Sequence, residues 1–248
     1  MGPVTTPAPS PCALETHFLG RHQNLEFARA ARDAMLARVG FEEVRFLPNR
    51  PNKIESARPH PLPGFLYANG VESNGRVLGL VFPTGAQPAA DNGSAVHVTT
   101  EMLAGSVNAG LIVDGLAYAE LYGTMPIDLA ASLASAVRAA RDAGVGFWPA
   151  ESFGVDRAAT ITGVNDLSEL VCFPKLYRRL VSYFLANPGS DLSGFDAWIR
   201  SDVVTRDDIV GLPTRELGNM HDTYLVEGDS LRLRYHPEEL LFEPDPPR

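Results

Sequence analysis

Acidic and imidazole side chains gather near the start of the chain, where Glu15, His17 and His22 stand within eight positions. Carboxylates and imidazoles are common ligands of divalent metal ions. Their spacing matches no metal-site motif, so loop and helix-capping roles explain this segment better. His221 and Asp222 are an adjacent pair of the same ligand types, but no histidine flanks them closely.

A small basic patch is predicted further along, where Lys175, Arg178 and Arg179 recur at helical spacing beside Tyr177 and Tyr183. Cations interleaved with aromatic side chains can contact nucleic acid. A solvated helix face explains the same pattern more simply. The sequence contains neither a Gly-rich phosphate loop nor a nucleophilic Ser-His-Asp pattern.

Composition and charge indicate an acidic globular protein of 248 residues, with 45% hydrophobic and 21% charged residues and a net charge of −9. Residues 1–150 hold 11 basic and 13 acidic side chains, whereas residues 151–248 hold 10 and 17. The acidity therefore belongs mainly to the C-terminal part. It argues against broad electrostatic binding of nucleic acid, although a local positive cluster is enough to hold one or two phosphates.

Other classes of protein are excluded by the pattern of residues. No apolar run approaches the length of a membrane-spanning helix, so we expect no membrane partner. The two cysteines, Cys12 and Cys172, fit neither a zinc motif nor a disulfide framework. Residues 1–11 contain four prolines and no positive charge, which predicts a disordered leader and not a signal peptide. Cytoplasmic residence follows as the expectation.

Periodicity predicts the elements of the first half. A helix is expected over residues 24–39, with Asn24 as its N-cap and Gly40 as its C-terminal cap. A strand is expected over residues 41–47, followed by a loop rich in proline and asparagine over residues 48–63.

A β-hairpin and two helices are predicted next. Two apolar runs, residues 64–71 and 76–82, flank an Asn-Gly pair, which is a strong turn signal. Helices are expected over residues 100–116 and 126–143, and Gly144 terminates the second.

The C-terminal part is predicted to begin with a linker over residues 151–166. Helices are expected over residues 167–185 and 195–199. Short strands follow, with a turn at Gly228-Asp229, over residues 209–212, 223–226, 231–235 and 240–242.

Four segments carry a resemblance to the staphylococcal-nuclease-like (thermonuclease) family. Residues 75–82, Gly-Arg-Val-Leu-Gly-Leu-Val-Phe, resemble its Gly-Arg-x-Leu-Ala strand. Residues 106–117 resemble its Val-Asn-x-x-Leu-(x3)-Gly-Leu-Ala helix, and residues 140–148 resemble the Ala-(x)n-Gly-x-Trp end of its last helix. Residues 12–15, Cys-Ala-Leu-Glu, stand where the family has Asp-x-Pro-Glu. The segments occur in the family's order over about 135 residues.

The resemblance implies an oligonucleotide-binding-type barrel with packed helices, and hydrolysis of DNA or RNA phosphodiesters, usually with calcium. It implies that Glu15 positions or deprotonates the attacking water and that Arg76 holds the scissile phosphate. Tyr118 and Tyr122 stand where the family places tyrosines near the bound nucleotide. These types suit the chemistry, because a guanidinium stabilises the charge of the transition state and a carboxylate can activate water.

Two departures from the family pattern bear on activity. The first barrel strands, with their Asp-Gly-Asp motif and second arginine, have no counterpart here, so we expect the front of the domain to be missing. Cys12 stands at the second metal-binding aspartate, and a soft thiol suits calcium poorly. The metal ligands are therefore unknown. A surface arginine at Arg76 and a solvated loop glutamate at Glu15 remain alternatives.

The sequence thus predicts an α+β chain with a partial OB-type, thermonuclease-like barrel, packed helices and a small C-terminal helix and β-hairpin module. The predicted parts are a leader (1–11), a thermonuclease-like domain (12–150), a linker (151–166) and an extension (167–242). The predicted function is metal-dependent hydrolysis of nucleic-acid phosphodiesters, weakened or lost in this chain. The alternative is a non-enzymatic nucleic-acid- or protein-binding module. A homodimer through exposed sheet edges is a further hypothesis.

Overall fold

The computed structural model describes residues 10–15, 17–71, 77–202 and 205–243. It is a mixed α+β fold in which the described residues form six α-helices and small antiparallel sheets of two or three strands. None of the sheets within these ranges closes into a barrel. Nor does any helix within them have the length and hydrophobicity needed to cross a bilayer.

Helix α1 (Leu25–Val39) begins and ends where the sequence predicts. The Asn24 side chain accepts a hydrogen bond from the Glu26 N–H at 3.0 Å. Gly40 ends the helix at φ 120°, a left-handed conformation that glycine adopts without steric cost, and its N–H reaches the Leu36 and Ala37 carbonyls. Both predicted caps are confirmed.

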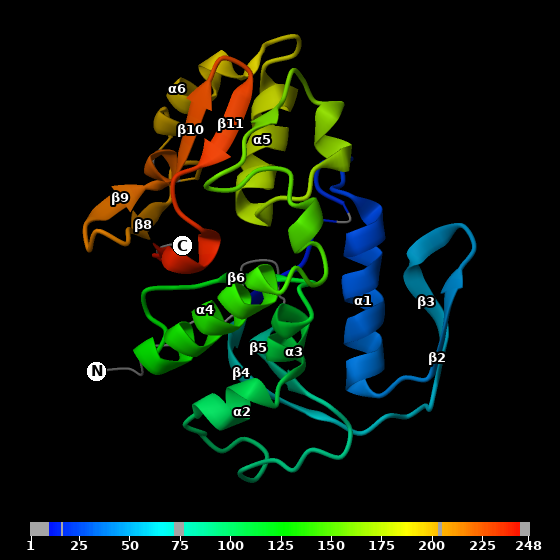
Figure 1. The fold of residues 1–248 in the computed structure, drawn as a ribbon. Helices are drawn as coiled ribbons and strands as arrows, with labels where there is room; N and C mark the ends of the chain where they lie inside the picture. The colour runs from blue at the N-terminus through cyan, green and yellow to red at the C-terminus, as the bar shows by residue number, and fades with distance from the viewer. Residues whose placement is uncertain (1–9, 16, 72–76, 203–204, 244–248) are drawn as a thin grey trace.

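A two-stranded ribbon follows and rises beside α1 (Figure 1), and Arg32 of the helix contacts both of its strands. It pairs β2 (Glu43–Leu47) with β3 (Arg50–Arg58), so the predicted loop over residues 48–63 is wrong over residues 50–58. Nearly every side chain of β3 is exposed. The strand therefore lacks the alternation of polar and apolar residues by which a half-buried strand is recognised.

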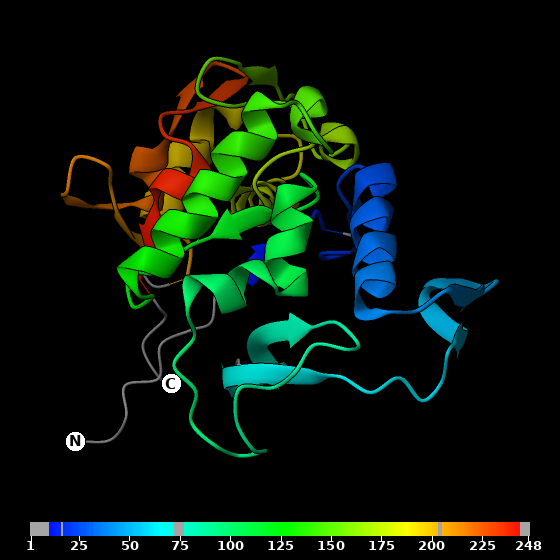
Figure 2. The same ribbon diagram turned by 60° about the horizontal axis from the view of Figure 1, so that its bottom comes forward.

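The predicted hairpin is confirmed as β4 (Phe65–Val71) paired with β5 (Val77–Phe82). The rings of Phe65 and Phe82 stack on each other across it, and the Tyr67 ring meets both of them edge-on. The Asn-Gly turn and Arg76 lie outside the described residues. Figure 2 shows this hairpin beneath the layer formed by the helices that follow it in the chain.

That layer consists of α2 (Thr100–Ala104), α3 (Val107–Val113) and α4 (Ile127–Asp142). The single helix predicted over residues 100–116 is wrong, because the chain breaks at Gly105. Ser106 then caps a new helix by accepting a hydrogen bond from the Ala109 N–H at 3.1 Å. The helix predicted over residues 126–143 is confirmed.

Strand β6 (Tyr118–Glu120) runs between α3 and α4 and pairs with β1 (Ser10–Cys12). The predicted disordered leader is therefore wrong for its last two residues. Pro11 is tolerated because β1 is an edge strand, where a missing N–H costs little. The first nine residues lie outside the described part of the chain.

The C-terminal part packs helices α5 (Pro174–Ala186) and α6 (Phe195–Arg200) against two three-stranded sheets. The helix predicted over residues 167–185 begins later, at Pro174, which occupies its first turn. The sheets are β7 (Ala159–Thr160) with β10 (Tyr224–Glu227) and β11 (Ser230–Leu233), and β8 (Ile209–Gly211) with β9 (Leu217–Asn219) and β12 (Leu241–Phe242). Short 3-10 helices lie at Trp148–Ala150, Asp166–Glu169, Leu192–Gly194, Met220–Thr223 and Pro237–Glu239.

One hydrophobic core runs through both predicted parts of the chain. The fully buried ring of Tyr118 contacts Phe147 and Trp148 from the first part and Phe173 from the second. Trp148 is 5% exposed, as expected of a residue that fills a core. Residues 12–150 and 167–242 therefore share their packing across the predicted linker.

Two glycines allow the chain to cross itself tightly where α3 and α4 end. Gly115 and Gly146 adopt φ of +65° and +61°. A Cβ on Gly146 would lie 2.1 Å from the Gly115 carbonyl oxygen, and a Cβ on Gly115 would lie 2.3 Å from the Val145 oxygen. Only glycine fits at either position.

We expect Gly146→Ala to lower the free energy of unfolding by about 3 kcal/mol, because it combines left-handed strain with a backbone clash. Gly64→Ala is the matched control, since its Cβ meets nothing closer than 3.7 Å. Urea denaturation measures both. Equal stability of the two variants would show that the crossing is not tight.

Candidate functional site

Glu15 is held in place by the backbone that follows β1. Its N–H donates to Gln23 Oε1 at 2.9 Å, and the Gln23 N–H donates to the Glu15 carbonyl at 2.9 Å. Gln23 is fully buried, and its Nε2 donates to the Cys172 carbonyl at 2.8 Å. The loop that carries Glu15 is thereby anchored to the core of the C-terminal part.

Three cations of α5 face this loop and the end of β6. Lys175, Arg178 and Arg179 stand at i, i+3 and i+4, so they share one face of the helix. The sequence favoured a solvated face, and this is wrong: Lys175 is only 8% exposed, and the two arginine side chains are 28% and 17% exposed. A buried cation requires a partner.

Each of these cations pairs with a carboxylate that is distant in sequence. Arg178 Nη1 lies 2.7 Å from Glu15 Oε1, and Arg179 Nη2 lies 2.6 Å from Asp208 Oδ2. Lys175 Nζ lies 3.0 Å from Glu120 Oε1 and 3.4 Å from Asp208 Oδ1. We call these six side chains the charge network. It joins the N-terminal loop, β6 and the C-terminal part.

Glu120 is the buried centre of the network. Its Oε1 accepts hydrogen bonds from Lys175 Nζ and from the Tyr122 hydroxyl, the latter at 2.8 Å. Burial alone would raise the pKa of Glu120, but the charges of Lys175 and Arg178 hold it below its ordinary value. Glu120 is therefore ionised in the folded protein.

Cys12 ends β1 beside Glu120, Glu15 and Arg178. Burial raises the pKa of the Cys12 thiol well above its ordinary value, and Glu120 raises it further. The thiol is therefore neutral at physiological pH and is neither a nucleophile nor a good metal ligand in this state.

The two predicted substrate-binding tyrosines have different surroundings. Tyr118 is fully buried, and its hydroxyl donates to Glu151 Oε1 at 2.9 Å. Tyr122 is half-buried beside the charge network. In this conformation the Tyr118 ring is closed to a nucleotide, whereas part of Tyr122 is reachable. Their role in substrate binding stays a prediction.

Arg76 lies outside the described residues, but the strand that follows it is firmly placed. The Val81 N–H donates to Asn108 Oδ1 at 2.9 Å, and Asn108 Nδ2 donates to the Gly79 carbonyl at 3.2 Å. The buried Asn108 side chain thus joins β5 to α3. Residues 77–82 and 106–117, which belong to two segments of the family resemblance, therefore lie against each other.

The histidines near Glu15 form no metal site in the described part of the chain. His17 is exposed, and His22 Nδ1 lies 2.9 Å from the Gln23 carbonyl oxygen. Across the described ranges, no three His, Cys, Asp or Glu side chains are grouped as ligands. His221 pairs mainly with the buried Asp207, at 2.6 Å, which the adjacent pair in the sequence did not indicate.

The residues around Glu15 do not fit calcium. Calcium prefers six to eight oxygen ligands, chiefly from carboxylates and carbonyls. The carboxylates of Glu15 and Glu120 are already bound by Arg178 and Lys175, and Cys12 presents a neutral thiol. The expected calcium site is therefore not supported by this set of donors.

Glu151 is a further titratable carboxylate, and it lies beside the core, where it accepts the hydrogen bond of the Tyr118 hydroxyl. Burial raises its pKa to about 7 from an ordinary value of 4.5, although the hydrogen bond from Tyr118 opposes the shift. Its position follows directly after the Trp148 segment, and nothing in the sequence around it distinguished it from a solvated glutamate.

We expect Lys175→Met to lower the free energy of unfolding by about 3–5 kcal/mol, because it leaves the Glu120 carboxylate buried without its cation. The double variant Lys175→Met with Glu120→Gln should recover part of that loss. Arg200→Met, which removes an exposed pair with Asp196, is the control and should cost less than about 1 kcal/mol. Similar losses for Lys175→Met and Arg200→Met would contradict the buried network.

Glu151 predicts a specific pH dependence. Between pH 4.5 and about 7 the unfolded chain releases this proton while the folded protein retains it. Stability from Glu151 is therefore greatest below pH 4.5, falls as the pH rises to about 7, and is constant above that. The fall amounts to about 3 kcal/mol.

Glu151→Gln should remove this decline, because the amide keeps an acceptor for Tyr118 but does not titrate. Urea denaturation at intervals from pH 5 to pH 8 measures it, with the exposed Glu169→Gln as control. An unchanged pH slope in Glu151→Gln would disprove the assignment.

No family model, curated protein or solved structure matches this chain.

Proposed function

We propose that the chain is a nuclease-like phosphodiesterase with weak turnover, in which Glu15 and Arg76 are the catalytic residues and Arg178 positions Glu15. The observation that carries this proposal is the pair formed by Glu15 and Arg178. Both side chains are partly open to solvent, at 21% and 28%, whereas Glu120 and Lys175 behind them are almost closed. Substrate can therefore reach this end of the charge network.

A carboxylate beside a guanidinium suits phosphodiester hydrolysis. Arg178 uses one N–H for Glu15 in the described contacts, and its planar fork has further donors for phosphate oxygens. Glu15 Oε1 accepts that bond, which leaves Oε2 for a water molecule. In the proposed step the water oxygen bonds to phosphorus, its proton passes to Glu15, and the bond to the leaving oxygen breaks. Solvent then protonates the leaving group.

The proposed lineage is supported by how the motif residues are used. Asn108 links β5 to α3, and Gly115 and Gly146 make a crossing that only glycine allows. Both features fall within the segments that resemble the thermonuclease family. On this proposal the β4–β5 hairpin and α3 belong to a partial OB-type barrel, and the substrate is DNA or RNA.

Weak turnover follows from the charges of the site. The network contains three carboxylates and three cations, so they neutralise one another before substrate arrives. A phosphate that uses the remaining donors of Arg178 gains less than at a free arginine, because Glu15 already balances its charge. No calcium step is proposed, because the available donors do not fit that ion.

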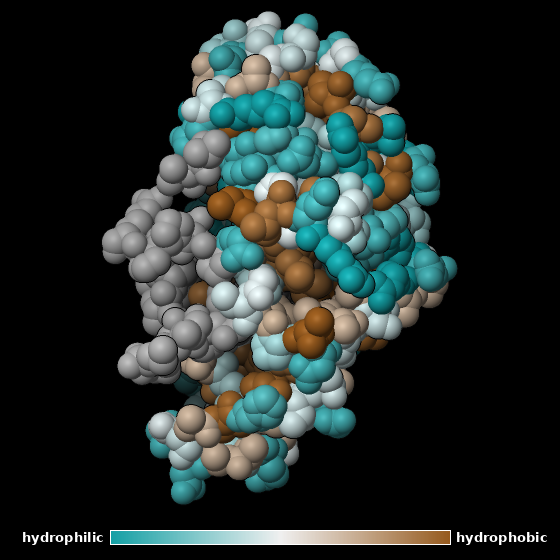
Figure 3. Space-filling view, turned by 90° about the vertical axis from the view of Figure 1, so that its left-hand side faces the viewer, coloured by the Kyte–Doolittle hydropathy of each residue, from teal (hydrophilic) through white to brown (hydrophobic). Residues whose placement is uncertain are grey.

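A non-enzymatic nucleic-acid- or protein-binding module is the second candidate. The observation that favours it is the full pairing of Lys175, Glu120, Asp208 and Arg179, which makes most of the network structural. Self-association is also proposed, through the edge strand β9. Leu217 on β9 is 75% exposed, and apolar patches interrupt the polar surface on the face drawn in Figure 3.

We expect the purified chain to cleave labelled single-stranded DNA or RNA slowly, and Glu15→Gln or Arg76→Ala to reduce the rate about 100-fold. Arg178→Lys should reduce it less, because the charge is kept and only the fork is lost. Glu55→Gln, an exposed carboxylate on β3, is the control and should leave the rate unchanged. Gel electrophoresis of the products measures all four variants.

The outcomes separate the candidates. Equal rates for the wild type and Glu15→Gln would reject catalysis by this site. Retained binding of nucleic acid without cleavage would favour the non-enzymatic module. Rates should also change less than about twofold between EDTA and excess calcium, since the donors are occupied. Activity that requires calcium would show that the charge network opens.

A further inference from the structure

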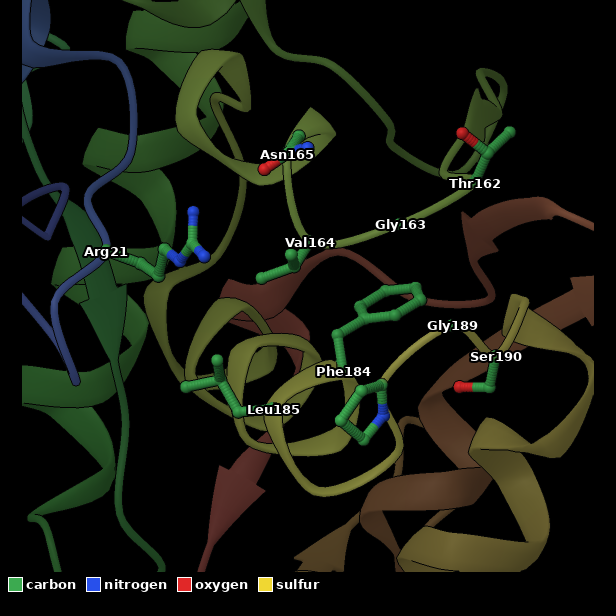
Figure 4. Close-up of a pocket in the computed structure, with 10 residues that line it drawn as sticks. Arg21, Thr162, Gly163, Val164, Asn165, Phe184, Leu185, Gly189 and Ser190 are labelled. Carbon is green, nitrogen blue, oxygen red and sulfur yellow. The ribbon is translucent and has the colours of Figure 1, made fainter.

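A pocket that the proposed function does not use lies at the C-terminal end of α5. Its volume is about 430 Å³, within the range of small-molecule sites. It is bounded by Arg21 from the N-terminal loop, by residues 162–165, and by residues 184–190 at the end of α5 and beyond it. Figure 4 shows Arg21 reaching from one side toward Val164 and Asn165 on the other.

Arg21 is placed by a tight turn. Phe18 and Arg21 exchange two backbone hydrogen bonds, at 2.7 and 2.9 Å. Between them Leu19 and Gly20 both adopt left-handed φ, 49° and 78°. Such a conformation is strained for leucine, at about 1–3 kcal/mol, and strain of this kind is concentrated at ligand sites. The turn fixes where the arginine side chain leaves the backbone.

The Arg21 guanidinium is an unpaired cation. It has no ion-pair or hydrogen-bond partner among the residues that the structure describes. Arg178 and Arg179, by contrast, are each bound to a carboxylate. A half-buried guanidinium with all its donors free is suited to bind an anion, and phosphate fits its planar fork.

The opposite wall of the pocket is rigid and mixed in character. Asp166 Oδ2 accepts hydrogen bonds from the Thr162 N–H, the Thr162 hydroxyl and the Gly163 N–H, at 2.7 to 3.2 Å. This holds the 162–165 loop in place. The Asn165 side chain projects from it beside Val164, and Leu185 at the end of α5, 40% exposed, adds apolar surface to the pocket (Figure 4).

We propose that this pocket binds a nucleoside monophosphate, with the phosphate on Arg21 and the base against Val164 and Leu185. An amide such as that of Asn165 offers both a donor and an acceptor, which suits the polar edge of a base. The inference deepens the proposed function, on which it rests for the identity of the ligand: a nucleotide released or held beside Glu15 would occupy it. Gln23, hydrogen-bonded to Glu15, is two residues from Arg21.

Isothermal titration calorimetry in EDTA tests the pocket with adenosine monophosphate, adenosine and inorganic phosphate as probes. We expect adenosine monophosphate to bind at least tenfold more tightly than adenosine or phosphate, because only it uses both walls. Arg21→Gln should weaken that binding at least tenfold. Arg29→Gln, an exposed arginine on α1, is the matched control and should leave it unchanged.

Gly163→Leu provides a second variant that fills the pocket. No atom lies within 4 Å of a Cβ at Gly163, so the first added carbon meets no neighbouring atom. It should also abolish binding of adenosine monophosphate. Binding that survives both Arg21→Gln and Gly163→Leu would overturn the proposal, as would phosphate binding as tight as that of adenosine monophosphate.

The two proposals fail in different ways. Binding of adenosine monophosphate that depends on Arg21, without cleavage of nucleic acid, would support the pocket and reject turnover at Glu15. Cleavage that depends on Glu15, with nucleotide binding indifferent to Arg21, would support turnover and reject the pocket.

Discussion

The buried pair of Glu120 and Lys175 is the interaction on which the rest of the site depends. Glu120 ends β6, which holds β1 and thereby the loop of Glu15, and Lys175 begins α5. Two charges taken out of water are stable only if each remains paired. Neither element can move away from the other without leaving a bare charge in the core, so the N-terminal loop and the C-terminal part are fixed together.

Because of this ion pair, α5 is part of the site and not a separate extension. A domain that ended at residue 150 would leave Glu120 without a cation and Glu15 without Arg178. Replacing such a pair by apolar side chains is often neutral or stabilising in other proteins. We therefore infer that the charge network fixes how the segments are arranged. One face of α5 sets the positions of three carboxylates that come from three separate segments.

Features that depend on neighbouring residues in the sequence, such as helix ends and turns, are predicted correctly. Asn24 and Gly40 bound α1 because a cap needs a side-chain acceptor at one end and a left-handed residue at the other. The β4–β5 hairpin follows from its turn signal and its apolar runs. Strand β3 was missed because a strand exposed on both faces carries no alternation of polar and apolar residues.

The site was predicted less well, because its contacts are not local. Glu120 and Lys175 are 55 positions apart, and Glu15 and Arg178 are 163 apart. A basic residue on a helix looks the same in sequence whether it meets water or a buried carboxylate. Only the fold shows that Lys175 is buried against carboxylates and that Arg21 has none beside it among the described residues. Helical spacing did place the three α5 cations on one face.

The contrast between these cations indicates where an anion can gain by binding. A net charge of −9 repels polyanions at long range, so binding needs an uncompensated cation at short range. In the charge network each cation already has a carboxylate within 3.0 Å, so an incoming phosphate meets charges that are already balanced. Among the described residues, no carboxylate forms an ion pair with Arg21. A small anion should therefore bind more tightly at Arg21 in the pocket than a nucleic-acid backbone binds at Glu15, because the charges around Glu15 already balance one another.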